Sequence, residues 1–344
     1  MVSSYQCFFV LAIFCFSIPV ARGFTVSTNP IPVSSKRSET VCALFQDGIL
    51  YDEPVFRPPA EWRSLILQVT IGCSWNKCTF CEMYQTKKFR AKPLDQVELE
   101  IKAFAAESGN VRDIFLADGD AMTLPTKHLL ALLGLINLYL PEVRRVSSYC
   151  LPRNVAHKSV EDLTMLKDAG LSLVYVGCES GNDAVLSAVN KGESFHSSIN
   201  ALTKLKEAGI KRSVMILLGL GGRKLSMQHA LSSAELCSVS SPEFLSVLTT
   251  SFPRGMNRID AGFGGDFQPL TAREALLELK TFLEGIDIAT NKTIFRSDHA
   301  SNYLVLKGRL GRDRDTMISE LTAVLNAPEE DDFYKLRPEW ARGL

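Results

Sequence analysis

Residues 65–81 read LILQVTIGCSWNKCTFC, an apolar run of strand length that passes directly into three closely spaced cysteines. Such a run, ended by a glycine, predicts a buried strand followed by a loop. Similar runs recur along the chain, so the predicted strands are Leu65 to Thr70, Asp113 to Ala117, Val143 to Tyr149, Leu171 to Gly177, Ser213 to Leu218 and Phe244 to Thr250.

Helical patterns lie between these runs, near residues 94–107, 126–139, 159–169, 196–208 and 226–237, with a further helix near 271–284. Gly109, Gly170 and Gly209 stand where a helix C-cap favours glycine. Alternating strands and helices predict an α/β fold with a parallel sheet, here a partial (β/α)6 TIM-like barrel in one compact domain. We also expect a strand-like segment at Ser301 to Leu306 and a last helix near 313–325.

The composition excludes several classes of protein. The 344 residues include 38 Lys plus Arg and 38 Asp plus Glu, so the formal net charge is zero and gives no clear nucleic-acid footprint. The apolar share of 46% and the charged share of 22% are those of a globular protein. Nine cysteines are too sparse for a disulfide scaffold. Cys42, Cys150, Cys178 and Cys237 are expected to be small buried hydrophobes.

The N-terminus is expected to be a targeting sequence. Residues 1–23 form a signal-like leader, because the apolar run from Cys7 to Phe16 is too short for a spanning helix and no stable membrane span is expected in the mature chain. Residues 24–44 are rich in Ser and Thr and poor in acids, as in transit peptides. Together they resemble the bipartite plastid presequences of algae with complex plastids, with simple secretion as the alternative. The core is expected over residues 45–290 and a C-terminal extension over 291–344.

Polar residues gather where the predicted strands end. In barrels of this kind the loops at the carboxyl ends of the strands converge on one mouth, where the chemistry takes place. The expected mouth segments are the three-cysteine loop, Asp118-Gly119-Asp120, Pro152-Arg153-Asn154, Glu179-Ser180-Gly181, Gly219-Leu220-Gly221-Gly222 and Ser251-Phe252-Pro253-Arg254. Glycines and acids also mark ordinary turns, which is the structural alternative.

Cys73, Cys78 and Cys81 have the spacing C-x4-C-x2-C. Three thiolates on one loop can hold a cluster or a metal ion. Structural zinc would need a fourth ligand, with Glu82, Cys150, Cys178 and the histidines as candidates. A [4Fe-4S] cluster with three protein ligands would instead keep one iron open, as catalysis at a metal requires. Unligated cysteines are the third alternative.

The string GCSWNKCTFCEMY from Gly72 to Tyr84 resembles the cluster loop of radical S-adenosylmethionine (radical SAM) enzymes. The segments FLADGDAM, YVGCESG, NKG, ILLGLGG, RSDHASNYL and LRPEWARGL are similar to an uncharacterised bacterial-type group of that superfamily, loosely likened to oxygen-independent coproporphyrinogen oxidases. The commonest superfamily spacing is C-x3-C-x2-C, so this loop carries one extra residue between Cys73 and Cys78.

The resemblance implies a [4Fe-4S] cluster and S-adenosyl-L-methionine (SAM) as cofactors. Cys73, Cys78 and Cys81 would be its metal ligands, and Phe80 would contact the adenine. Asp118, Gly119 and Asp120 stand where a turn meets the SAM amino group, and Glu179 and Ser180 where polar groups meet the ribose and methionine. Gly219, Gly221 and Gly222 would let the backbone approach the nucleoside. A helix N-terminal acid near Asn182 is the structural alternative for Glu179.

The same resemblance implies an enzyme that cleaves SAM reductively and uses a 5'-deoxyadenosyl radical on an unidentified substrate, supplied with electrons by a reductase or ferredoxin-type donor. Polar groups for that substrate would come from Arg153, Asn154, Arg212 and the 296–303 segment, with His299, Asn302 and Arg254 as candidate catalytic residues. The alternative is a zinc- or cluster-stabilised non-catalytic barrel that serves as a binding or scaffold protein.

We predict that residues 1–45 fused to a fluorescent reporter deliver it to the plastid. Delivery there would let the chain acquire iron after import, whereas an oxidising secretory compartment does not suit an iron-sulfur centre. Fluorescence microscopy of transformed algal cells measures the outcome, and a reporter recovered from the medium would contradict the presequence.

Overall fold

The computed structural model describes residues 42–44, 50–107, 110–287 and 292–343. The expected leader at 1–23 and residues 24–41 of the transit-like segment lie outside the described residues. Among the helices that are described, none is both long and apolar enough to span a bilayer.

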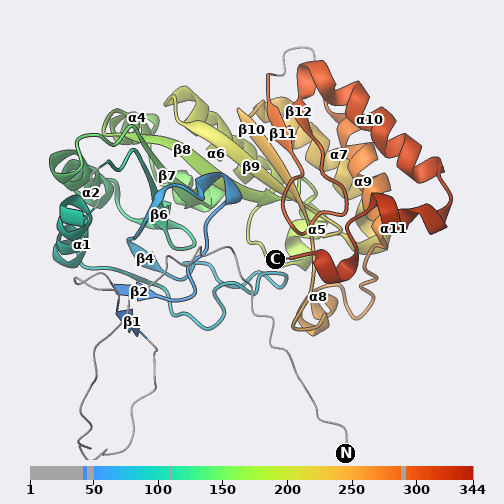
Figure 1. The fold of residues 1–344 in the computed structure, drawn as a ribbon, viewed down its shortest axis with the longest axis horizontal. Coiled ribbons are helices and arrows are strands. Elements are labelled where there is room, and N and C mark those ends of the chain that lie inside the picture. The colour runs from blue at the N-terminus through green and yellow to red at the C-terminus, as the bar shows by residue number, and fades with distance from the viewer. Residues whose placement is uncertain (1–41, 45–49, 108–109, 288–291, 344) are drawn as a thin grey trace, which may run out of the picture.

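One large sheet organises the described chain (Figure 1). Its eight strands run in the spatial order β12-β11-β10-β9-β8-β7-β6-β3. All neighbours pair in parallel except β11 and β12, which are antiparallel. The strands are β3 (Leu65–Gln68), β6 (Asp113–Ala117), β7 (Arg145–Cys150), β8 (Leu171–Glu179), β9 (Lys211–Leu218), β10 (Phe244–Thr249), β11 (Ile294–Arg296) and β12 (Lys307–Arg309).

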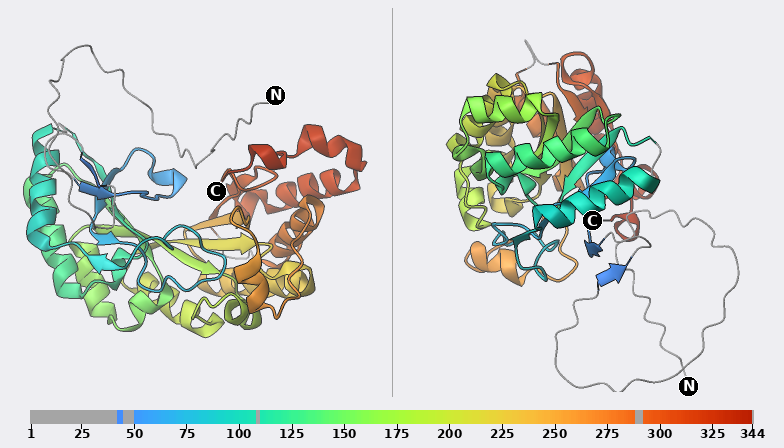
Figure 2. Two further views of the ribbon diagram at one scale, coloured as in Figure 1. Left: turned by 90° about the horizontal axis from the view of Figure 1, so that it is seen from below. Right: turned by 90° about the vertical axis from the view of Figure 1, so that its left-hand side faces the viewer.

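Helices cover the convex face of this curved sheet, and the concave face stays open on one side (Figure 2). Successive helices of the outer layer pack against one another. They are α1 (Leu94–Glu107), α2 (Thr126–Tyr139), α4 (Val160–Asp168), α6 (Phe195–Glu207), α7 (Gly222–Ser240), α9 (Ala272–Gly285) and α10 (Leu310–Asn326). This layered arrangement confirms the predicted α/β class and the partial TIM-like barrel.

Side-chain alternation separates the two faces of each strand. On β9, Val214, Ile216 and Leu218 belong to the buried core. The intervening Ser213 and Met215 line a cavity on the concave side. The core therefore lies between the sheet and the helices, while the concave face is free to hold a site.

The prediction of a strand-like segment at Ser301 to Leu306 is wrong. These residues form a turn whose ends are closed by Ser297 N–H donating to the Leu306 carbonyl at 2.8 Å. Arg337 Nη1 in the C-terminal tail donates to the carbonyl of Asn302 at 2.9 Å and thereby holds the turn. The strands that do form here, β11 and β12, lie on either side of this turn. They extend the sheet beyond residue 290, where the core was expected to end.

The N-terminal part of the described chain lies within the concave face (Figure 2). The 3₁₀ turn η1 (Pro59–Glu61) brings the fully buried Glu61 to the sheet, where Tyr175 Oη donates to its carboxylate at 2.6 Å and Arg145 Nη2 at 3.0 Å. The small hairpin β1 (Cys42–Leu44) and β2 (Leu50–Asp52) precedes it, and β4 (Thr70–Ile71) pairs with β5 (Arg90–Ala91).

Arg212, one of the residues expected near the substrate, lies instead at the amino-terminal start of β9. Its guanidinium is buried and donates to the carbonyls of Ser240 at 2.8 Å and Ser241 at 3.0 Å, and to the Glu243 carboxylate at 2.8 Å. It therefore joins the end of α7 to the sheet.

We predict that Arg212→Met lowers the free energy of unfolding by about 3 kcal/mol, because the two carbonyls lose their charged donor inside the protein. Thermal unfolding followed by circular dichroism measures the change. Arg312→Met, at an exposed position of α10, is the matched control and should change the melting temperature little. Equal melting temperatures for the two variants would contradict this role.

Candidate functional site

A cavity of about 730 Å³ opens on the concave face. Cys73, Cys78 and Cys81 line it, and so do Phe80, Gly119 and Glu179 from the predicted set. These residues come from the cysteine loop and from the carboxyl ends of β6 and β8. Of the six segments expected at one mouth, the cysteine loop and the segments at 118–120, 179–181 and 251–254 contribute to the lining, whereas those at 152–154 and 219–222 do not.

Two buried carboxylates hold the cysteine loop to the end of β6. Asp118 Oδ2 accepts from the Gly72 N–H at 3.0 Å and from Lys87 Nζ at 2.9 Å. Asp120 Oδ1 accepts from the Ser74 N–H at 2.9 Å. Both side chains are fully buried, and neither lines the cavity. Burial raises the pKa of both carboxyls, while these donors act in the opposite direction.

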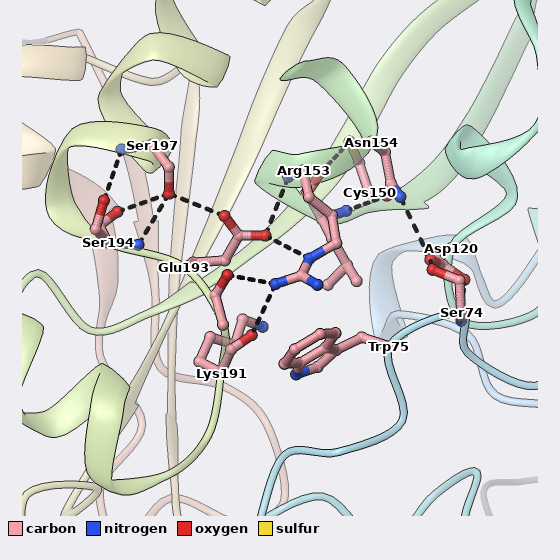
Figure 3. A network of polar contacts seen from close by, with 12 residues as sticks. Ser74, Trp75, Asp120, Cys150, Arg153, Asn154, Lys191, Glu193, Ser194 and Ser197 are labelled. Atoms are coloured by element: carbon pink, nitrogen blue, oxygen red, sulfur yellow. Dashed lines mark hydrogen bonds and ion pairs between the residues drawn. The ribbon is translucent and has the colours of Figure 1, made fainter. Parts of the chain in front are cut away.

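A second set of contacts holds the loop from the side of β8, as Figure 3 shows. The Arg153 guanidinium lies 3.7 Å from the centre of the Trp75 ring, and its Nε donates to Glu193 at 2.8 Å. Trp75 Nε1 donates to the carbonyl of Asn190 at 2.8 Å. Arg153 was expected to face the substrate; here it joins the loop to the turn that contains Lys191.

Arg258, in the short helix α8 (Asn257–Gly262), also supports the cysteine loop. Its Nη2 donates to the carbonyl of Cys78 at 2.8 Å and its Nη1 to that of Cys81 at 2.9 Å. Sequence reasoning missed this residue, because nothing local in the sequence links position 258 to a loop nearly 180 residues earlier.

The three thiols of the loop are free and face the same cavity. Burial raises the pKa of Cys73 to about 11 and that of Cys78 to about 12, and it raises the pKa of Cys81 in the same direction. Lys191 opposes this rise at Cys78 and Cys81. Iron must therefore displace protons when it binds, as thiolate ligation requires.

The three loop thiols fit a cluster that takes three protein ligands. Among the described residues, no three His, Cys, Asp or Glu side chains are grouped closely enough to hold one metal ion. A cubane cluster instead attaches each thiolate to a different iron, so its ligands stand further apart. Of the candidate fourth zinc ligands, Cys150 and Cys178 are buried hydrophobes like Cys237, whereas Glu82 and His299 line the cavity.

Glu179 forms a buried ion pair beside the cysteines. Its Oε1 accepts from Lys191 Nζ at 3.0 Å, and the backbone of Glu179 has φ 67° at an irregularity in the β8 register. Burial lowers the pKa of Lys191, but the Glu179 carboxylate together with Cys78 and Cys178 raises it, and the net shift is upward. The helix-cap alternative for Glu179 is not seen, because Asn182 caps α5 (Asp183–Ala188) by accepting from the Val185 N–H.

Other residues that were predicted to contact SAM lie behind the cavity wall. The Ser180 hydroxyl donates to His229 Nδ1 at 2.7 Å, since His229 Nε2 faces the Leu217 carbonyl. The Gly219 N–H donates to the buried Glu278 at 2.6 Å. Gly221 and Gly222 begin α7, and none of these three glycines lines the cavity.

The candidate catalytic residues are in different places. His299 lines the cavity, where the Ser301 N–H donates to its Nδ1 at 3.1 Å, and burial lowers its pKa. Asn302 is buried behind the wall and donates to the Val247 carbonyl at 2.8 Å. Arg254 is exposed, 3.8 Å from Glu82, and does not line the cavity.

Comparisons with known proteins agree with this arrangement. Residues 67–234 match the model of the radical SAM superfamily. The heme chaperone HemW of Bacillus subtilis (strain 168) is 23% identical over 165 residues, 46% of this chain and 43% of that protein. The chain thus matches less than half the length of that relative.

Two solved structures are similar. The radical S-adenosylmethionine methyltransferase TsrM from Kitasatospora setae is 19% identical, with 54% of this chain and 34% of that one covered and a TM-score of 0.43. Methylornithine synthase (PylB) is 14% identical, with 79% and 84% covered and a TM-score of 0.45.

We predict that Gly177→Ala destabilises the site. A Cβ at position 177 would lie 2.2 Å from Glu179 Oε1 and 3.3 Å from Lys191 Nζ, so the ion pair would have to shift at a cost of about 1–3 kcal/mol. Gly134→Ala in α2 is the matched control, because no atom lies within 4 Å of its added Cβ. Thermal unfolding should show a lower melting temperature for the first variant only; a stable Gly177→Ala protein would contradict the packing.

Proposed function

Since residues 67–234 match the radical SAM superfamily model, we propose that this protein is an enzyme that cleaves SAM reductively and acts on a further substrate in the same cavity. The observation that carries the proposal is the opening of all three loop cysteines on one large cavity at the carboxyl ends of the strands. No disulfide links them, so all three thiols are free for iron.

A [4Fe-4S] cluster bound here would supply one electron, passed on from an external donor, for the reductive cleavage of SAM and for hydrogen abstraction from a substrate. Cys73, Cys78 and Cys81 would hold the cluster. The protein's part is to fix this loop and shield it, which Asp118, Asp120 and the other loop anchors support.

Among the predicted SAM contacts, Phe80, Gly119 and Glu179 are the ones that line the cavity. We propose that Phe80 contacts the adenine and that the Glu179 carboxylate, paired with Lys191, accepts from the nucleoside. Gly119 permits close approach, because an added Cβ would lie 2.9 Å from Cys73 Cβ.

Asp118, Asp120 and Ser180 contribute differently in this proposal. Their side chains already bind protein donors and acceptors, so they act as positioning residues for the loop and for the end of β8. Gly219, Gly221 and Gly222 likewise shape the turn that starts α7.

His299 is the proposed proton donor to the substrate. Because Nδ1 accepts from the Ser301 N–H, the proton of the neutral ring resides on Nε2. Asn302 and Arg254 are less suited, the first because its amide holds the 297–303 turn to β10 and the second because it lies outside the cavity.

The proposal also includes an electron donor and a cellular location. A reductase or ferredoxin-type protein would supply the electron. Plastid delivery by residues 1–44 would provide a reducing compartment for the thiols.

We predict that the full chain, reconstituted anaerobically with iron and sulfide, produces 5'-deoxyadenosine from SAM under reducing conditions. Alanine at Cys73, Cys78 and Cys81 should abolish cluster absorbance and product, because three thiolates are the minimum ligand set. Cys237→Ala, which removes a buried thiol in α7, should keep both. Zinc in place of iron in the unaltered protein, or a cluster without SAM cleavage, would favour the non-catalytic barrel.

A further inference from the structure

Below the cysteine loop the cavity is wide, because glycine and serine occupy several positions of its wall. Neighbouring strands place Gly177, Met215, Ser246 and Arg296 in one row across the wall. The row below contains Ser213 between Tyr175 and Phe244. A closed barrel fills these positions with large branched side chains, so glycine and serine here leave room for a ligand.

One end of this row is cationic. Arg296 on β11 lines the cavity and is exposed to it. The antiparallel register places Lys307 directly opposite Arg296, and Arg309 opposite Ile294. Residues opposite one another in an antiparallel pair point to the same face, so all three cations belong to the concave face. Arg296 lines the cavity, whereas Lys307 and Arg309 lie beside it and outside its lining.

Two other cations of the same cavity are neutralised within the protein, while Arg57, which also lines it, has only the Ser64 carbonyl as a hydrogen-bond acceptor among the described residues, at 3.4 Å. Lys191 is paired with Glu179 at 3.0 Å, and Arg145 with Glu61 at 3.0 Å. Within the described ranges, no carboxylate lies within 4.0 Å of the side-chain nitrogens of Arg296 or Lys307, and Asp298 on the same wall does not reach them. Two adjacent like charges without an acid repel each other, which an anionic ligand would relieve.

The wall between the cations and the cysteine loop is largely apolar. Tyr175, Met215 and Phe244 line it, and Phe115 and Tyr149 stack edge to face around Tyr175. A ligand in this space would bury an apolar or aromatic body and present its acid group toward β11.

We propose that Arg296, with Lys307 and Arg309 beside it, binds the acid group of an organic anion whose apolar body occupies the cavity between Tyr175, Met215 and Phe244. This inference rests on the proposed function, because that anion would be the substrate which receives the radical. A guanidinium suits a carboxylate, sulfonate or phosphate, since its planar donors can bind two oxygens.

Naphthalene-2-sulfonate is a suitable probe, with uncharged naphthalene-2-sulfonamide as its matched partner of nearly equal shape. Equilibrium dialysis of the reconstituted full chain measures both dissociation constants without interference from the coloured cluster. Arg296→Gln should weaken sulfonate binding about 10-fold and Lys307→Gln about 3-fold, while sulfonamide binding changes less than about 2-fold. Arg312→Gln on the outer face of α10 loses the same charge and should change neither constant.

The Ser246→Phe variant tests where the probe binds. Its phenyl ring would fill the wall position next to Arg296 and should weaken the binding of both ligands about 10-fold or more. Circular dichroism confirms that this variant is folded. Sulfonate affinity that is unchanged in Arg296→Gln, or retained in Ser246→Phe, would overturn the proposal, as would no binding to the unaltered protein. Sulfonate binding as expected without SAM cleavage would count against the proposed function alone, and the anion site would stand.

Discussion

The hydrogen bonds from the cysteine loop to Asp118 and Asp120 are the contacts on which the site depends. A loop with three thiols has no regular structure of its own, so its backbone donors need acceptors from elsewhere. The two carboxylates provide them at the end of β6, and Lys87 compensates the buried charge of Asp118. Removal of either acid would leave loop donors unsatisfied inside the protein.

The remaining loop contacts come from three distant parts of the chain. Arg153 stacks on Trp75, Arg258 binds two cysteine carbonyls, and the Asn190 carbonyl accepts from the indole. Each contact fixes the loop from a different direction. These contacts hold the loop in one position through protein groups alone, and such support is the condition for placing a bound group precisely.

The cavity divides naturally into two halves with different chemistry. Near the loop, the cavity is lined by the aromatic ring of Phe80 and by the internal ion pair of Glu179 and Lys191. Toward β11, small residues and aromatic rings surround space that ends at Arg296. The two halves therefore offer different contacts, a ring and an ion pair near the loop and a cation beside an apolar wall near β11.

The sequence alone determined the α/β class, the six strand and helix units, and the identity of the cysteine loop, because periodic burial and ligand spacing are local properties. Only the tertiary structure decided which polar residues face the cavity. Glu179 and His299 do, whereas Ser180, Asn302 and Arg212 turn toward protein partners. The strands β11 and β12 also escaped prediction, since three-residue strands carry no periodic signal and are held by their neighbours in the sheet. Side-chain direction at a strand end depends on contacts far away in the sequence, and these exist only once the chain has folded.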